Sequence, residues 1–119
     1  MFLIIEQNEE LAEIYNRLLL NAGYDGLLKN SYRDAINLAE KEVSDIDFVV
    51  ADAGKNQDIS GIIQILKKFK NCKICLIVDE TTPEIEKIVS VYQISSLLVK
   101  PFIPSQLLKV VFLLDRKIV

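Results

Sequence analysis

The feature that most constrains the fold of this chain is a regular alternation of short apolar runs with amphipathic segments. The apolar runs predict strands at residues 2–5, 25–30, 47–51, 73–78 and 96–99. Apolar residues recur at helical spacing between them, which predicts helices at residues 8–23, 31–43, 59–70 and 81–93 and a last helix that begins at Pro104. Because parallel strands need crossover connections, this pattern predicts a doubly wound α/β fold, with five parallel strands in one sheet and helices on both of its faces.

Capping signals support the limits of the predicted helices. Asn8 is placed to cap the first helix and Gly23 to end it, Ser31 opens the second, and Thr82 before Pro83 marks the start of the fourth. No linker, repeat or low-complexity tract interrupts the pattern. We expect residues 1–119 to form a single domain, because 119 residues with 50% apolar content suffice for one core.

The charge pattern limits the classes of partner. The net charge is −3, and acidic and basic residues are interspersed along the chain. Because this gives no basic field, we expect no binding of nucleic acid by this chain alone. The longest apolar runs, such as VVFLL at residues 110–114, are shorter than the roughly 18 residues that cross a bilayer, and the first residues lack the basic stretch of a signal peptide. We therefore expect no membrane segment and a cytoplasmic location.

The two cysteines, in the sequence CKIC at residues 72–75, have the spacing of a redox or zinc motif. A redox pair lies at the start of a helix, whereas these residues lie in an apolar run that would place the sulfurs on opposite strand faces. Zinc needs about four ligands, and the chain has no histidine and only two cysteines. We interpret both as packing residues in a reducing compartment.

Ligands of doubly wound sheets bind beyond the carboxyl ends of the strands. The residues at those ends are Glu6, Gln7, Asp52, Val78, Asp79 and Lys100. An aspartate after a strand is often only a turn former, and a lysine before proline is often only solvated, so neither alone indicates a site. Asp52 and Lys100 at the same edge of one sheet together indicate a charged site.

Three segments at these strand ends resemble the CheY-like receiver domain of two-component response regulators. LIIEQN at residues 3–8 lies where that family has an acidic pair after the first strand. DFVVAD at residues 47–52 lies where it has the phosphoacceptor aspartate, and LLVKPF at residues 97–102 where it has a Lys-Pro pair. The resemblance spans essentially the whole chain and implies a flavodoxin-like, doubly wound (βα)5 sandwich with the strand order 2-1-3-4-5.

The resemblance implies a phosphoryl-accepting site. Asp52 would be the acceptor, and Lys100 would pair with it and later with the phosphoryl group. Such an attack requires that the charge on the transferring oxygens be neutralised, which a divalent cation and a lysine achieve. By resemblance, Glu6, Asp52 and the backbone carbonyl of Gly54 would hold Mg²⁺. The bond before Pro101 is commonly cis in this family.

The chain departs from the family where the cation binds and where phosphorylation is sensed. Gln7 replaces a metal-binding acid and is at most a weak ligand, so we expect weak Mg²⁺ binding. Val78 replaces the Thr or Ser that bonds the phosphoryl oxygen, and Leu97 replaces the switch aromatic. Asp79 adds negative charge near an incoming phosphate. These departures indicate a degenerate pseudo-receiver with a degraded switch.

We therefore expect a receiver domain of two-component phosphorelay signal transduction that acts through protein–protein interaction, with phosphorylation of Asp52 slow or absent. Its partner would be a sensor histidine kinase or another signalling protein, and it would not be an enzyme beyond self-catalysed phosphoryl acceptance. The alternative is a conventional phosphoaccepting receiver that uses Mg²⁺. A flavodoxin-like cofactor binder is disfavoured, because EQNEEL at residues 6–11 would repel a phosphate.

The last predicted helix has more apolar residues than one stripe against the sheet requires. That stripe consists of Leu107, Leu108, Val111 and Leu114. Val110, Phe112 and Leu113 are then surplus, and we expect them to form an exposed patch. The patch would serve as a homodimer interface, through the fourth helix, the fifth strand and the fifth helix, or as a dock for an output partner. The alternative is that Phe112 or Leu113 folds back against a neighbouring helix.

Overall fold

A computed structural model describes residues 1–40, 46–54, 58–69 and 72–116 of the chain. The strands are β1 (Phe2–Ile5), β2 (Gly26–Lys29), β3 (Phe48–Gly54), β4 (Lys73–Val78) and β5 (Ser96–Val99). The helices are α1 (Glu9–Asn21), α2 (Tyr32–Glu40), α3 (Ile59–Leu66), α4 (Pro83–Val91) and α5 (Pro104–Arg116). Each strand is followed by a helix, which confirms the predicted alternation.

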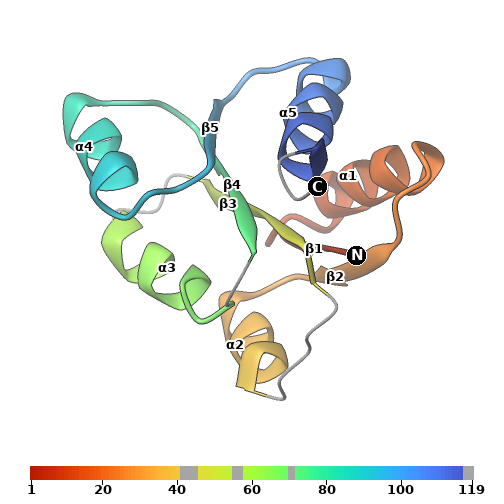
Figure 1. Ribbon diagram of the computed structural model, residues 1–119, viewed down its shortest axis with the longest axis horizontal. Helices are drawn as coiled ribbons and strands as arrows, with labels where there is room; N and C mark the ends of the chain where they lie inside the picture. The colour runs from red at the N-terminus through yellow and green to blue at the C-terminus, as the bar shows by residue number, and fades with distance from the viewer. Residues whose placement is uncertain (41–45, 55–57, 70–71, 117–119) are drawn as a thin grey trace.

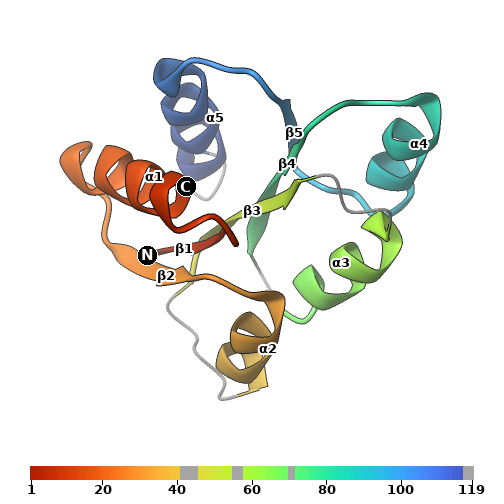
Figure 2. The same ribbon diagram turned by 180° about the vertical axis from the view of Figure 1, so that it is seen from behind.

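The five strands form one parallel sheet in the order β2-β1-β3-β4-β5. Figures 1 and 2 show α1 and α5 on one face of this sheet and α2, α3 and α4 on the other. The predicted flavodoxin-like sandwich and its strand order are therefore confirmed. From β1 the chain adds β2 on one side and then β3, β4 and β5 on the other. Ligands of such sheets bind where the strand order reverses, so a site is expected beyond the carboxyl ends of β1 and β3.

Side-chain caps begin three of the helices where the sequence predicted them. Asn8 Oδ1 accepts a hydrogen bond from the Leu11 N–H, Ser31 Oγ accepts one from the Asp34 N–H, and Thr82 Oγ1 accepts one from the Ile85 N–H, each at 3.1 Å. These bonds satisfy backbone donors that the first turn of a helix leaves without partners. No helix in the described part of the chain is long and apolar enough to cross a membrane.

Two predicted limits differ from the structure. Helix α3 ends at Leu66 and not at residue 70, because the chain turns there and buries Phe69 in the core. Strand β3 runs on past residue 51 to Gly54, because Asp52 and Gly54 still pair with β4. Val43, which the sequence placed in the second helix, lies outside the described residues.

Side chains of alternate strand residues form two cores, one on each face of the sheet. The core under α1 and α5 contains Phe2, Ile4, Phe48, Val50, Cys75 and Ile77. The core under α2, α3 and α4 contains Leu3, Ile5, Val49, Ala51, Ile74, Leu76 and Val78. The cysteines belong to opposite cores, as predicted: Cys75 is buried under α1 and α5, and Cys72 packs on the other side, where its thiol donates to the Ile46 carbonyl at 3.0 Å.

Candidate functional site

Four charged side chains meet at the carboxyl edge of the sheet, on the face that α1 and α5 cover. Glu6, Asp52 and Asp79 each lie two residues beyond a core residue of that face, and Lys100 follows β5 with the same alternation. Parallel strands end at the same edge, so the alternation brings these residues together. They line one open cavity of about 400 Å³, together with Gln7 and Gly54 among others.

Asp52 is the centre of this cavity and is only 6% exposed. Its Oδ2 lies 2.7 Å from Lys100 Nζ, and its Oδ1 accepts a hydrogen bond from the Gly54 N–H at 2.7 Å. Burial would lower the pKa of Lys100, but the hydrogen bond and the charge of Asp52 outweigh it and raise that pKa. The structure thus brings the predicted acceptor and the predicted lysine together as an ion pair between a buried carboxylate and a half-buried ammonium group.

Glu6 lies beside Asp52 and is 5% exposed. Its Oε1 accepts a hydrogen bond from the Asn8 N–H at 2.9 Å, whereas its Oε2 is buried and accepts none from any described residue. Burial, followed by the neighbouring carboxyl of Asp52, raises the pKa of Glu6 from 4.5 to about 8. Without a cation in the cavity, the protonated form of Glu6 is therefore favoured more than that of an ordinary carboxyl group.

The oxygen atoms at the cavity have the chemistry to bind one hard divalent cation, but few of the groups that supply them are carboxyl groups. The described residues contain no group of three or more His, Cys, Asp or Glu side chains arranged to hold a metal. Two buried carboxyl groups, those of Glu6 and Asp52, point into the cavity, and the orphaned Glu6 Oε2 is an oxygen that a cation would satisfy. Gln7 also lines the cavity, with an exposed neutral side chain, and Gly54 supplies a carbonyl.

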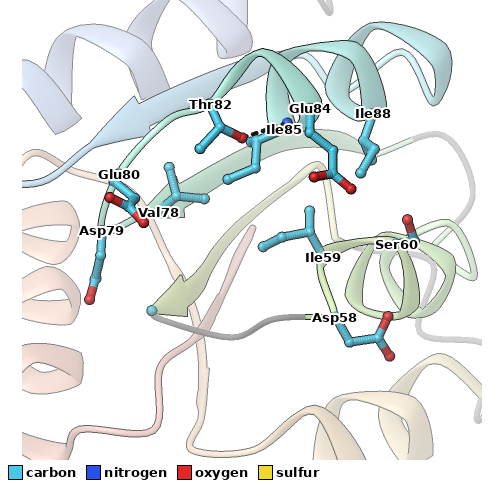
Figure 3. Close-up of a pocket in the computed structure, with 11 residues that line it drawn as sticks. Asp58, Ile59, Ser60, Val78, Asp79, Glu80, Thr82, Glu84, Ile85 and Ile88 are labelled. Atoms are coloured by element: carbon cyan, nitrogen blue, oxygen red, sulfur yellow. Dashed lines mark hydrogen bonds between the residues drawn. The ribbon is translucent and has the colours of Figure 1, made fainter.

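Val78 and Leu97 lie on the opposite face of the same edge. Both belong to the core under α2, α3 and α4, where Val78 is buried and Leu97 is half-buried. Val78 also lines a second cavity of about 630 Å³ between α3 and α4 (Figure 3). Asp79 lines both this cavity and the one around Asp52. Neither Val78 nor Leu97 has a polar side-chain atom, so neither of the two can donate a hydrogen bond to a group bound at Asp52.

Asp79 takes part in the site more directly than the sequence suggested. Its Oδ1 lies 3.4 Å from Lys100 Nζ, so the lysine contacts two carboxylates. Figure 3 shows the Asp79 side chain pointing away from Thr82 and Ile85. The sequence predicted added negative charge here, and the alternation of β4 side chains could also have predicted the contact with Lys100.

Three further polar residues support the site and were not predicted. Tyr32 donates a hydrogen bond from its hydroxyl to the Asp52 carbonyl at 2.9 Å, and Asn30 Nδ2 donates one to the Glu6 carbonyl at 3.2 Å. The Tyr15 ring is buried and stacks on Phe102, with centroids 6.1 Å apart. Burial first, and then the charges of Asp52 and Glu6, raise the pKa of Tyr15, which places its hydroxyl within the field of the acids.

The three surplus apolar residues of α5 do not form one continuous patch. Phe112 is 52% exposed and lines a shallow cavity with Ala22 and Tyr24, on the flank of α5 that faces α1. Val110 and Leu113 are three residues apart and share the other flank, where Val110 is half-buried and Leu113 is 48% exposed.

The peptide bond between Lys100 and Pro101 is cis, as the resemblance implied.

No protein-family model matches the sequence, and no curated protein sequence matches it significantly. Solved structures match along nearly the whole chain. The chemotaxis protein CheY4 of Vibrio cholerae has a TM-score of 0.78 at 23% identity, with 95% of this chain and 96% of that chain covered. The signal receiver domain of a putative Luxo repressor from Vibrio parahaemolyticus has a TM-score of 0.81 at 19% identity, with 98% and 90% covered.

A CheY-like response regulator receiver domain from Methanospirillum hungatei also matches, with a TM-score of 0.78 at 18% identity and with 97% of this chain and 93% of that chain covered. These proteins share strand order, layering and length with the chain. Over nearly its whole length, the chain has the fold of the CheY-like receiver domains of response regulators.

Proposed function

We propose that this chain is a signalling domain of the receiver type, which acts in a two-component phosphorelay in the cytoplasm through contacts with other proteins. Asp52 is the phosphoacceptor in this proposal, and its phosphorylation is slow. The observation that carries the proposal is the ion pair between the buried Asp52 and the half-buried Lys100, whose charged atoms lie 2.7 Å apart at the carboxyl edge of a receiver-like sheet. A turn-forming aspartate would be solvated instead.

The residues at this edge have the chemistry of phosphoryl acceptance. The Asp52 carboxylate attacks the phosphorus of a donor, and Lys100 then balances charge on the phosphoryl oxygens. Glu6, Asp52 and the Gly54 carbonyl would hold Mg²⁺, which supplies further charge neutralisation when bound. Tyr32 and Asn30 fix the backbone of the two acids through their hydrogen bonds to the Asp52 and Glu6 carbonyls.

Two features support slow acceptance and weak signalling of the phosphorylated state. Gln7 is neutral, so the segment after β1 supplies one carboxylate, that of Glu6, where the family has two. The cost of removing water from Mg²⁺ is therefore offset by less negative charge, and Mg²⁺ binding is weaker. Val78 and Leu97 supply neither a hydroxyl nor an aromatic ring on the α4 face. In the proposal, the domain therefore works mainly as a docking module and not as a strong phosphorylation switch.

A sensor histidine kinase or another signalling protein is the partner in this proposal. A homodimer through α4, β5 and α5 is a further proposal, and it would use the flank of α5 that carries Val110 and Leu113. Val91 at the end of α4 is 67% exposed, so the dimer face would have an apolar residue on a second element.

Intact-mass analysis tests the acceptor. The protein is incubated with acetyl phosphate and Mg²⁺, beside an Asp52→Asn variant. We expect a small fraction of the protein to gain one phosphoryl group and the variant to gain none. Rapid and complete labelling of Asp52 would instead favour the conventional receiver. Equal labelling of the protein and the variant, or no labelling after prolonged incubation, would remove Asp52 as an acceptor.

A further inference from the structure

We propose that Asp79 is a specificity-determining residue of the Asp52 site: a fixed anion that occupies Lys100 and disfavours an incoming phosphoryl group. The proposal rests on the proposed function, in which Lys100 pairs with Asp52 first and with the phosphoryl group later. The inference adds that Asp79 determines how readily Lys100 leaves the carboxylates to pair with the phosphoryl group.

The geometry around Lys100 carries this proposal. Lys100 Nζ lies 2.7 Å from Asp52 Oδ2 and 3.4 Å from Asp79 Oδ1. The Asp52 side chain is 3% exposed and that of Asp79 is 28% exposed, so one carboxylate is inside the cavity and the other is at its rim. A lysine ammonium has three N–H donors, and the two carboxylates engage it from both sides.

The backbone keeps Asp79 and Lys100 next to each other. The Lys100 N–H donates to the Val78 carbonyl at 2.9 Å, and the Asp79 N–H donates to the Gly54 carbonyl at 3.4 Å. Asp79 is therefore fixed to the ends of β3, β4 and β5 and not carried on a separate loop. These backbone bonds hold the Asp79 carboxylate at the rim of the cavity, beside Lys100.

The transfer step shows why this position matters. An Asp52 carboxylate oxygen forms a bond to the phosphorus of acetyl phosphate, the bond from phosphorus to the acetyl oxygen breaks, and acetate leaves with the electron pair. The three phosphoryl oxygens keep their negative charge and need Lys100. Lys100 must then turn from Asp79 toward the phosphoryl group, which leaves the Asp79 carboxylate beside those oxygens without its cation. The repulsion disfavours both the transition state and the product.

Removing this charge without changing the side-chain shape tests the proposal. The variant is Asp79→Asn, and the matched control is Glu80→Gln, which removes one charge from the adjacent exposed residue. Beryllofluoride, an anionic mimic of the phosphoryl group, is titrated by ¹⁹F NMR at Mg²⁺ concentrations that saturate each variant. Acetyl phosphate labelling is followed by intact mass in parallel, with Asp52→Asn as the blank.

We expect Asp79→Asn to bind beryllofluoride about tenfold more tightly and to label about tenfold faster than the unchanged protein, because one repelling charge is removed within a few ångströms of the anion. Glu80→Gln should stay within about twofold, because screening by solvent weakens an exposed charge.

Three outcomes decide between the two proposals. A gain in Asp79→Asn alone supports the inference. Equal binding and labelling by the unchanged protein and Asp79→Asn, with none in Asp52→Asn, would overturn the role of Asp79 and leave the acceptor standing. No binding or labelling in any variant would overturn the acceptor and, with it, the inference.

Discussion

The carboxyl edge of the sheet has two faces, and they are built from different chemistry. The face toward α1 and α5 carries the ion pair of Asp52 and Lys100, with Glu6 and Asp79 around it. The face toward α3 and α4 carries Val78, which packs among apolar side chains a few ångströms away along the same strands.

This difference separates the chemistry of a receiver from its signalling. In a receiver, a group bound on the first face must change contacts on the second, because a ligand shifts a conformational equilibrium only through contacts that differ between the two states. Here Val78 and Leu97 on the second face have no polar side-chain atom, although the cavity beside Val78 also has polar residues in its lining, Ser60 and Thr82 among them. The comparison teaches that a charged pair and an apolar Val78 can stand at the same edge of one sheet, and the proposed function assigns phosphoryl acceptance to the first alone.

The largest expected effect on stability comes from removing the Lys100 ammonium group, whose positive charge balances Asp52. We expect Lys100→Met, which keeps most of the side-chain length, to lower the free energy of unfolding by about 2–3 kcal/mol, because it leaves a buried carboxylate without its partner. Adding Asp52→Asn to Lys100→Met should recover most of that loss. The measurement is urea unfolding, with the exposed Lys87→Met as control.

The single variant Asp52→Asn tests whether Asp52 itself is needed for stability. Since it removes one of several crowded acids, it should leave the fold intact and the stability unchanged or slightly raised. A large destabilisation by this single substitution would make Asp52 a structural residue and would contradict the site.

The second prediction is a dependence of stability on pH. The pKa of Glu6 is raised from 4.5 to about 8, so the folded protein holds a proton that the unfolded chain releases within this window. The unfolding free energy should therefore fall as pH rises from about 4.5 to about 8, by more than about 1 kcal/mol. Denaturant unfolding in EDTA measures it.

Glu6→Gln should flatten this dependence, because the amide does not titrate, and the exposed Glu10→Gln should leave it unchanged. A profile that rises with pH over this window in the unchanged protein would show that Glu6 is ionised when folded.

The third prediction concerns the cation. Gln7→Asp should bind Mg²⁺ about tenfold more tightly than the unchanged protein, a gain of roughly 1.4 kcal/mol from one more carboxylate at the cavity. Calorimetric titration measures it, and Gln64→Asp on the exposed side of α3 is the matched control. If both variants bind alike, Gln7 does not limit the affinity.

Sequence reasoning predicted most of the fold and the centre of the site. The strands at residues 2–5, 73–78 and 96–99 match to the residue, because each is an apolar run between polar residues. Asp52 and Lys100 were predictable because both end apolar runs. Tyr32 and Asn30 were not, since each bonds a carbonyl 20 or more residues away, and no local pattern records such a contact.

The α5 patch shows a further limit of sequence reasoning. Counting apolar residues predicted a surplus, and Phe112 and Leu113 are indeed about half-exposed. Which flank each occupies depends on how the helix is rotated against α1 and the sheet, and the cavity that Phe112 shares with Ala22 and Tyr24 is a tertiary feature. The sequence therefore predicted one exposed surface, whereas Phe112 lies on one flank of α5 and Val110 and Leu113 lie on the other.

The smallest expected effect on stability comes from α5. If the flank with Leu113 is the dimer face, Leu113→Lys should shift the protein toward monomer in analytical ultracentrifugation, while the unfolding free energy changes by less than about 0.5 kcal/mol. Phe112→Lys, on the opposite flank, is the matched control and should leave the mass unchanged. The same mass for both variants and the unchanged protein would exclude this interface.

The central claim is that the acceptor face is uncoupled from the α4 face, and backbone amide NMR spectra with and without saturating beryllofluoride and Mg²⁺ test it most directly. Asp52→Asn serves as the blank. The account predicts shifts confined to residues near Asp52, Gly54 and Lys100, because Val78 and Leu97 offer the bound group no new contact. Shifts that extend through α4 to Tyr92, or along α5 to Phe112, would contradict it.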